Sequence, residues 1–141
     1  MNRNEISIKR GSYAINIVKK VLEVLKQARD IRDFIISLPS DSFDARGIDA
    51  VVFLTDNILP IQVKSSRKRA QKHFKHHPSV RYLVAIHWQP QKKEDQEKII
   101  AELTRKVRAE IIRDFYGKHH KRVVLAVEKV GEDIKVDVEI Y

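Results

Sequence analysis

The chain has 141 residues, 43% of them hydrophobic and 33% charged, which is the size and composition of one domain with its own core. It has no cysteine, which excludes disulfides and thiolate metal sites and favours an intracellular, cytoplasmic setting. No apolar run approaches the roughly 18 residues of a membrane span, and the N-terminus lacks the pattern of a signal peptide, so we expect no membrane partner. The net charge of +9 favours a polyanionic partner.

Residues 1–10 are expected to form a loose or short extended lead-in. From Ser12 the apolar spacing i, i+3, i+4, i+7 predicts a helix that buries one face. The apolar positions of this helix are Ala14, Ile17, Val18, Val21, Leu22, Leu25 and Ala28. Glu23 lies on the opposite, solvated side by the 3.6-residue period.

Residues 31–38 predict a first strand that ends before Pro39, with continuation of the helix through residues 29–30 as the alternative. A polar loop over residues 39–46 follows and contains Asp44. Two apolar runs then flank the polar turn Thr55-Asp56-Asn57, which predicts a β-hairpin. Its buried face would carry Val52, Leu54, Leu59, Ile61 and Val63.

Three polar residues interrupt the apolar strands of this hairpin. Gln62 and Lys64 share a face because side chains alternate along a strand. A two-residue turn at Asp56-Asn57 would place Asp49 directly opposite Lys64, on that same face. We therefore expect an acid, an amide oxygen and an ammonium group to meet at the open end of the hairpin. The alternative is structural: Asp49 could cap a strand end or form an ion pair with Lys64, and Gln62 could make an edge-strand hydrogen bond.

A basic segment follows the hairpin. Between Asp56 and Glu94 there is no acidic residue, while nine lysines and arginines lie there; the rest of the chain has 19 basic and 19 acidic residues. Ser65 and Ser66 are expected to cap a helix whose N-terminus offers N–H groups to a phosphate. Candidate nucleic-acid-binding residues are Ser65, Ser66, Arg67, Lys68, Arg69, Lys72 and Lys75.

His73, His76 and His77 include an i, i+3 pair on the same predicted helix. With no cysteine nearby and basic neighbours, exposed or phosphate-facing histidines are favoured over a zinc site.

Residues 80–88 predict a buried strand. Because a helix separates it from the Gln62 strand, the two should pair in parallel. After a boundary at residues 90–94, residues 93–116 predict a long amphipathic helix, and residues 122–129 and 133–141 a hairpin around Gly131-Glu132. This C-terminal extension could enlarge the sheet or form a homodimer interface, and the sequence leaves both open.

The run Gly47-Ile48-Asp49, a short turn, then Gln62-Val63-Lys64-Ser65-Ser66 resembles the core of the PD-(D/E)xK nuclease superfamily. The resemblance covers about residues 11–88 and implies a restriction-endonuclease-like α/β fold: an αβββαβ core around a mixed sheet, here with the C-terminal helix and hairpin added over residues 91–141 of the same domain. It implies that Asp49 and Gln62 bind Mg²⁺ or Mn²⁺ and that Lys64 is catalytic. Gln62 stands where the family usually has Glu. Glu23 and Asp44 are the candidates for an additional acid.

Two functions follow as expectations. The first is a metal-dependent endonuclease acting on DNA, with RNA left open as a substrate. The second is a nucleic-acid-binding module of the same fold without catalysis, suggested by the replaced Glu and by the lack of a well-placed acid on the first helix.

Overall fold

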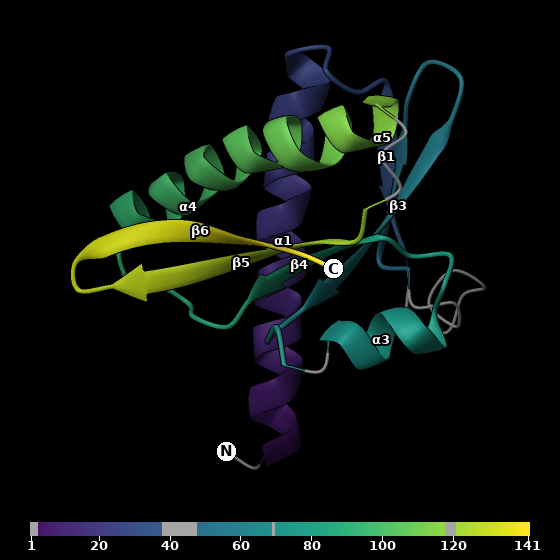
Figure 1. The fold of residues 1–141 in the computed structure, drawn as a ribbon. Coiled ribbons are helices and arrows are strands. Elements are labelled where there is room, and N and C mark those ends of the chain that lie inside the picture. Colours follow the sequence, from purple (N-terminus) through teal and green to yellow (C-terminus); the bar gives the residue numbers. More distant parts are fainter. Residues whose placement is uncertain (1–2, 38–47, 69, 118–120) are drawn as a thin grey trace.

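The computed structural model describes residues 3–37, 48–68, 70–117 and 121–141 (Figure 1). All six strands belong to one mixed sheet in the order β1-β2-β3-β4-β5-β6. Pairing is antiparallel from β1 to β3, parallel from β3 to β5, and antiparallel between β5 and β6. The elements in chain order are α1 (Arg3–Gln27), β1 (Asp33–Ile36), β2 (Ala50–Phe53), β3 (Ile58–Lys64), α3 (Ala70–His76), β4 (Tyr82–Ile86), α4 (Lys93–Lys106), the π-helical turn η1 (Val107–Ile112), α5 (Arg113–Gly117), β5 (Val123–Val130) and β6 (Asp133–Ile140).

The larger core lies between one face of the sheet and the helices α1 and α4 (Figure 1). The predicted apolar stripe of α1 is buried there, except that Ala28 lies beyond the helix and is exposed. The predicted apolar face of the β2–β3 hairpin is also confirmed, since all five of its residues belong to this core. The apolar face of α1 packs on the apolar face of the sheet, and the burial of both faces holds α1 across the sheet.

Helix α1 begins at Arg3, so the expectation of a loose or extended lead-in is wrong. Ile6 and Ile8 alternate as in a strand, but their separation by one residue is also compatible with a helix. Gly11 lies inside the helix instead of before it. A single interior glycine costs a helix about 1 kcal/mol relative to alanine, which does not end a helix of this length.

The smaller core lies on the other face of the sheet, under α3 (Figure 1). Phe74 and Ala70 of α3 pack there against apolar residues of three strands: Val51, Leu83, Ala85, Val124 and Ala126. Because α3 has only seven residues, it covers only part of this face. The polar residues of the candidate site lie beside it.

The C-terminal extension enlarges the sheet. Helical structure runs from Lys93 to Gly117, as predicted, and packs over the larger core. Its C-terminal end is tied to β4 by the Tyr82 hydroxyl, which donates a buried 2.7 Å hydrogen bond to Asp114. β5 pairs in parallel with β4, and Gly131 takes the positive φ of +64° that the tight β5–β6 turn requires. Within the described ranges, no helix is both long and apolar enough to cross a membrane.

Candidate functional site

The β2–β3 hairpin has a different register from the predicted one. Ala50 lies opposite Ile61, and the loop has four residues, Leu54 to Asn57, closed by a 2.8 Å hydrogen bond from the Leu54 N–H to the Asn57 carbonyl. A two-residue type I′ turn needs positive φ at both central residues. Among the described residues only Arg29 and Gly131 have positive φ, so Asp56 and Asn57 do not form that turn.

This register brings Asp49 next to Gln62 instead of Lys64, so the predicted pairing of Asp49 with Lys64 is wrong. The shift is two residues, and side chains repeat every two residues along a strand, so Gln62 and Lys64 keep their predicted face. The Asp49 N–H donates to the Ile61 carbonyl at 3.0 Å. The acid, the amide and the lysine therefore still gather at the same end of β3.

Asp49 immediately precedes β2, which starts at Ala50. At this edge β3 extends beyond Ile61, its last residue paired with β2. The Asp49 Oδ2 accepts a 2.8 Å hydrogen bond from the N–H of Val63, the residue between Gln62 and Lys64. β2 no longer supplies a partner for that N–H, and the carboxylate takes its place. This bond fixes the orientation of the Asp49 carboxylate beside the end of β3.

Gln62 is a buried polar residue, with 4% of its surface exposed. It pairs across the sheet with Leu83, on the face that α3 covers. Its Oε1 is buried and has no hydrogen-bond partner among the described residues. An amide oxygen left unsatisfied in a protein interior costs about 1–3 kcal/mol, so its presence beside a carboxylate calls for an explanation.

Lys64 has an exposed side chain and lines a cavity of about 370 Å³ between the end of β3 and α3. His73 of α3 lines the same cavity, and its ring lies 4.6 Å from that of His77, centroid to centroid. Burial, followed by the nearby positive charge of Lys64, lowers the pKa of His73 to about 4. His73 is therefore neutral at pH 7, and its Nε2 is buried with no partner in the described part of the chain.

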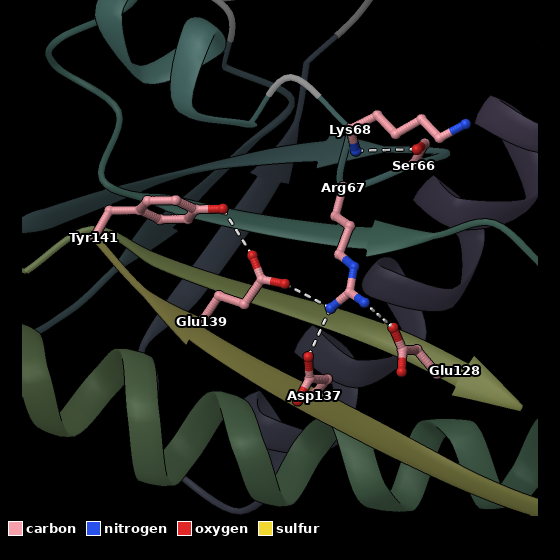
Figure 2. Close-up of polar contacts among 7 residues, drawn as sticks. All are labelled: Ser66, Arg67, Lys68, Glu128, Asp137, Glu139 and Tyr141. Atoms are coloured by element: carbon pink, nitrogen blue, oxygen red, sulfur yellow. Dashed lines mark hydrogen bonds and ion pairs between the residues drawn. The ribbon is translucent and has the colours of Figure 1, made fainter. Parts of the chain in front are cut away.

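The segment after β3 is a turn, and the expectation of a helix capped by Ser65 and Ser66 is wrong. The Ser66 hydroxyl accepts a 3.1 Å hydrogen bond from the Lys68 N–H, a local turn that competes with a helix (Figure 2). Helix α3 starts only at Ala70 and is too short to offer an anion site at its N-terminus. An anion at this segment would therefore have to be held by side chains instead of by the N-terminus of α3.

Arg67 is held by three carboxylates of the C-terminal hairpin. Its guanidinium lies 2.6 Å from an oxygen of Glu128 on β5 and 2.6 Å from oxygens of Asp137 and Glu139 on β6 (Figure 2). These carboxylates raise the pKa of Arg67. Tyr141 completes the group by donating a 2.7 Å hydrogen bond to Glu139. Since its charge is already compensated, Arg67 anchors the turn after β3 and is a poor candidate for phosphate contact.

Arg67→Met should lower the free energy of unfolding by about 1 kcal/mol, because three carboxylates would then face one another without a cation. The loss should shrink in high salt, which screens exposed charges. Urea denaturation at low and high salt measures it. Arg105→Met is the matched control, since Arg105 makes one exposed ion pair with Glu102 at 3.0 Å and its loss should change stability very little. Equal effects of the two substitutions would contradict the anchoring role.

The other predicted site residues are less central. Glu23 is exposed on α1, as expected for a solvated residue. Lys75 lies on α3 but does not line the cavity at Lys64. Asp44 and Arg69 lie outside the described residues. In the part of the chain that the structure describes, no three His, Cys, Asp or Glu side chains are grouped as a metal site.

Sequence reasoning missed Ser37, which follows β1. Its N–H donates to the Asp49 carbonyl at 2.8 Å, and its Oγ is buried with no partner among the described residues. It also missed the acids around Arg67, which are Glu128 on β5 and Asp137 and Glu139 on β6. In both cases the signal was the register of neighbouring strands, which a single sequence specifies only weakly.

Comparison of the chain with known protein families, with curated proteins and with solved structures gives no match.

Proposed function

We propose that the chain is a metal-dependent nuclease of the PD-(D/E)xK type that hydrolyses phosphodiester bonds in DNA. The observation that carries this proposal is the buried, unpartnered Oε1 of Gln62 beside the anchored carboxylate of Asp49. The element order αβββαβ, with β1 to β4 adjacent in the sheet, is the arrangement that the family resemblance implies. It supports a restriction-endonuclease-like fold.

The residues at the end of β3 fit a hard divalent cation. Mg²⁺ and Mn²⁺ prefer oxygen ligands, and Asp49 would supply a negative carboxylate while Gln62 supplies a neutral carbonyl oxygen. A cation at Gln62 Oε1 would remove the cost of the unsatisfied oxygen. With a single carboxylate, binding should be weak until an oxygen of the substrate phosphate joins the ligands.

The bound ion would polarise the scissile phosphate and lower the pKa of the attacking water. Asp49, whose carboxylate is oriented by the hydrogen bond from the Val63 N–H, would hold that ion. Lys64 is the next residue whose side chain lies on the face of Gln62, and its ammonium group would stabilise the negative charge that builds up on the phosphoryl oxygens.

The surface beside the site suits a nucleic acid. Lys64, Lys68 and Lys72 line one cavity, and none of its described lining residues is acidic. Arg67, whose charge is balanced by the C-terminal hairpin, is not part of this surface. Lysine side chains that reach phosphates supply most of the sequence-independent affinity for DNA.

A catalytically inactive nucleic-acid-binding module is the second candidate. It is favoured by one observation: within the described residues, Asp49 is not accompanied by further acids in a metal-binding group. This module would bind DNA in a salt-sensitive way that does not depend on Mg²⁺ or on the Asp49 carboxylate.

Cleavage assays with Lys64→Met test the proposal. Plasmid, branched DNA and single-stranded RNA are incubated with Mg²⁺ or Mn²⁺, and the wild type should cut DNA. Lys64→Met should cut on the order of 100-fold more slowly, as expected when a charge-stabilising group is removed. Lys98→Met, which removes an exposed lysine of α4, should cut at the wild-type rate. Absence of cleavage by the wild type in both metals, with DNA binding retained, would favour the inactive module.

A further inference from the structure

The cavity beside the candidate site has the composition of an anion pocket. It has a volume of about 370 Å³ and is lined by Lys64 at the end of β3, by Ser65, Ser66 and Lys68 of the following turn, and by Lys72 and His73 of α3. None of its described lining residues is acidic. Three ammonium groups around one concavity repel one another unless an anion lies between them.

The carboxylates of the C-terminal hairpin that face this turn contact Arg67 and do not line the cavity. Glu128, Asp137 and Glu139 hold Arg67, which leaves the turn on the side opposite to Lys68 in Figure 2. Arg67 therefore fixes the turn, and its own charge is engaged with these carboxylates instead of facing the cavity. The positive charge of Lys64, Lys68 and Lys72 is left for a ligand.

Uncharged donors in the cavity would complete an anion shell. The buried Nε2 of His73 has no partner among the described residues, and a ligand oxygen would satisfy it. The Ser66 oxygen accepts the Lys68 N–H, and the hydroxyl still has its own hydrogen to donate. Lysines, a hydroxyl and an imidazole together are the groups that surround bound phosphates.

We propose that this cavity binds a phosphate monoester dianion, the terminal phosphate of a nucleic-acid strand, independently of the metal. A dianion matches three ammonium groups better than the single charge of a backbone diester. At about 370 Å³ the cavity is at the small end of ligand sites, which suits a terminal phosphate and part of its sugar but not a stacked duplex. Lys64 would be shared with the candidate metal site, so a strand end held here places its next phosphodiester near Asp49 and Gln62. That last consequence, an end-directed substrate, rests on the proposed nuclease function, whereas the binding itself does not.

The test is a binding measurement without metal. Fluorescein-labelled duplexes with a 5′-phosphate, a 3′-phosphate or only hydroxyl ends are titrated with the protein in EDTA and a phosphate-free buffer, followed by fluorescence anisotropy. One phosphorylated end should bind about tenfold more tightly than hydroxyl ends, the size of one added charge-assisted contact. Inorganic phosphate should compete and remove this preference.

Two lysines of α3 provide the matched variants. Lys72→Ala should abolish the preference for a phosphorylated end, because Lys72 lines the cavity. Lys75→Ala removes the same charge from the same helix outside the cavity, so it should weaken all duplexes alike and keep the preference. Lys68→Ala, on the turn, should act as Lys72→Ala does. Equal binding of phosphorylated and hydroxyl ends by the wild type, or a preference that survives in both cavity variants, would overturn the proposal even if the protein cleaves DNA.

Discussion

Asp49→Asn is expected to abolish metal-dependent cleavage while the fold stays intact. Asparagine keeps an oxygen that accepts the Val63 N–H, which the Asp49 carboxylate contacts at 2.8 Å, but it removes the negative charge from the proposed ion site. A divalent ion supplies several kcal/mol of transition-state stabilisation, so cleavage should fall by about 10³-fold. The rate of plasmid nicking in Mg²⁺ measures the loss, and circular dichroism with urea denaturation measures the fold.

Two further variants separate charge from structure at this position. Asp49→Ala also leaves the Val63 N–H without its partner and should lower the free energy of unfolding by about 1–3 kcal/mol more than Asp49→Asn does. Asp56→Asn changes an exposed acid in the hairpin loop and should cleave like the wild type. Full cleavage by Asp49→Asn would show that Asp49 caps the end of β3 and has no part in the chemistry.

Gln62→Met is expected to stabilise the protein and to inactivate it. Methionine has nearly the shape of glutamine but no amide, so the substitution removes a buried oxygen that has no partner in the described structure. Without metal, the free energy of unfolding should rise by about 1–3 kcal/mol, the cost of one unsatisfied buried group. Cleavage should fall because the ion loses a ligand. Urea denaturation in EDTA and the nicking assay in Mg²⁺ measure the two effects.

Gln62→Glu is the complementary change. A second carboxylate should destabilise the buried position in EDTA and should bind the ion more tightly, so Mg²⁺ should raise the melting temperature more in this variant than in the wild type. A Gln62→Met protein that is less stable than the wild type in EDTA would mean that the amide is satisfied without an ion, and the metal site would lose its main support.

The order of elements could be predicted because it depends on patterns that burial enforces. The helical stripe of α1 and the alternating face of the hairpin place apolar residues in the larger core, and the crossover before β4 places Ala70 and Phe74 in the smaller one. Each of these elements has a single apolar face, so the spacing of apolar residues along the sequence was enough to predict which face is buried.

The details of the site could not be predicted because they depend on local turns and strand register. A loop of four residues instead of two moved Asp49 from Lys64 to Gln62. A serine turn at Ser66 replaced the first turn of the expected helix. Neither choice changes which residues are buried, so the apolar pattern carries no information about them. The capture of Arg67 by β6 likewise depends on a strand 70 residues away along the chain.

The most direct measurement is the position of Mn²⁺ in crystals of the wild-type protein, located by anomalous diffraction. We expect one ion at bonding distance, about 2.2 Å, from both a carboxylate oxygen of Asp49 and Oε1 of Gln62. An ion bound elsewhere, or a Gln62 Oε1 that accepts a protein hydrogen bond in the presence of Mn²⁺, would contradict this expectation.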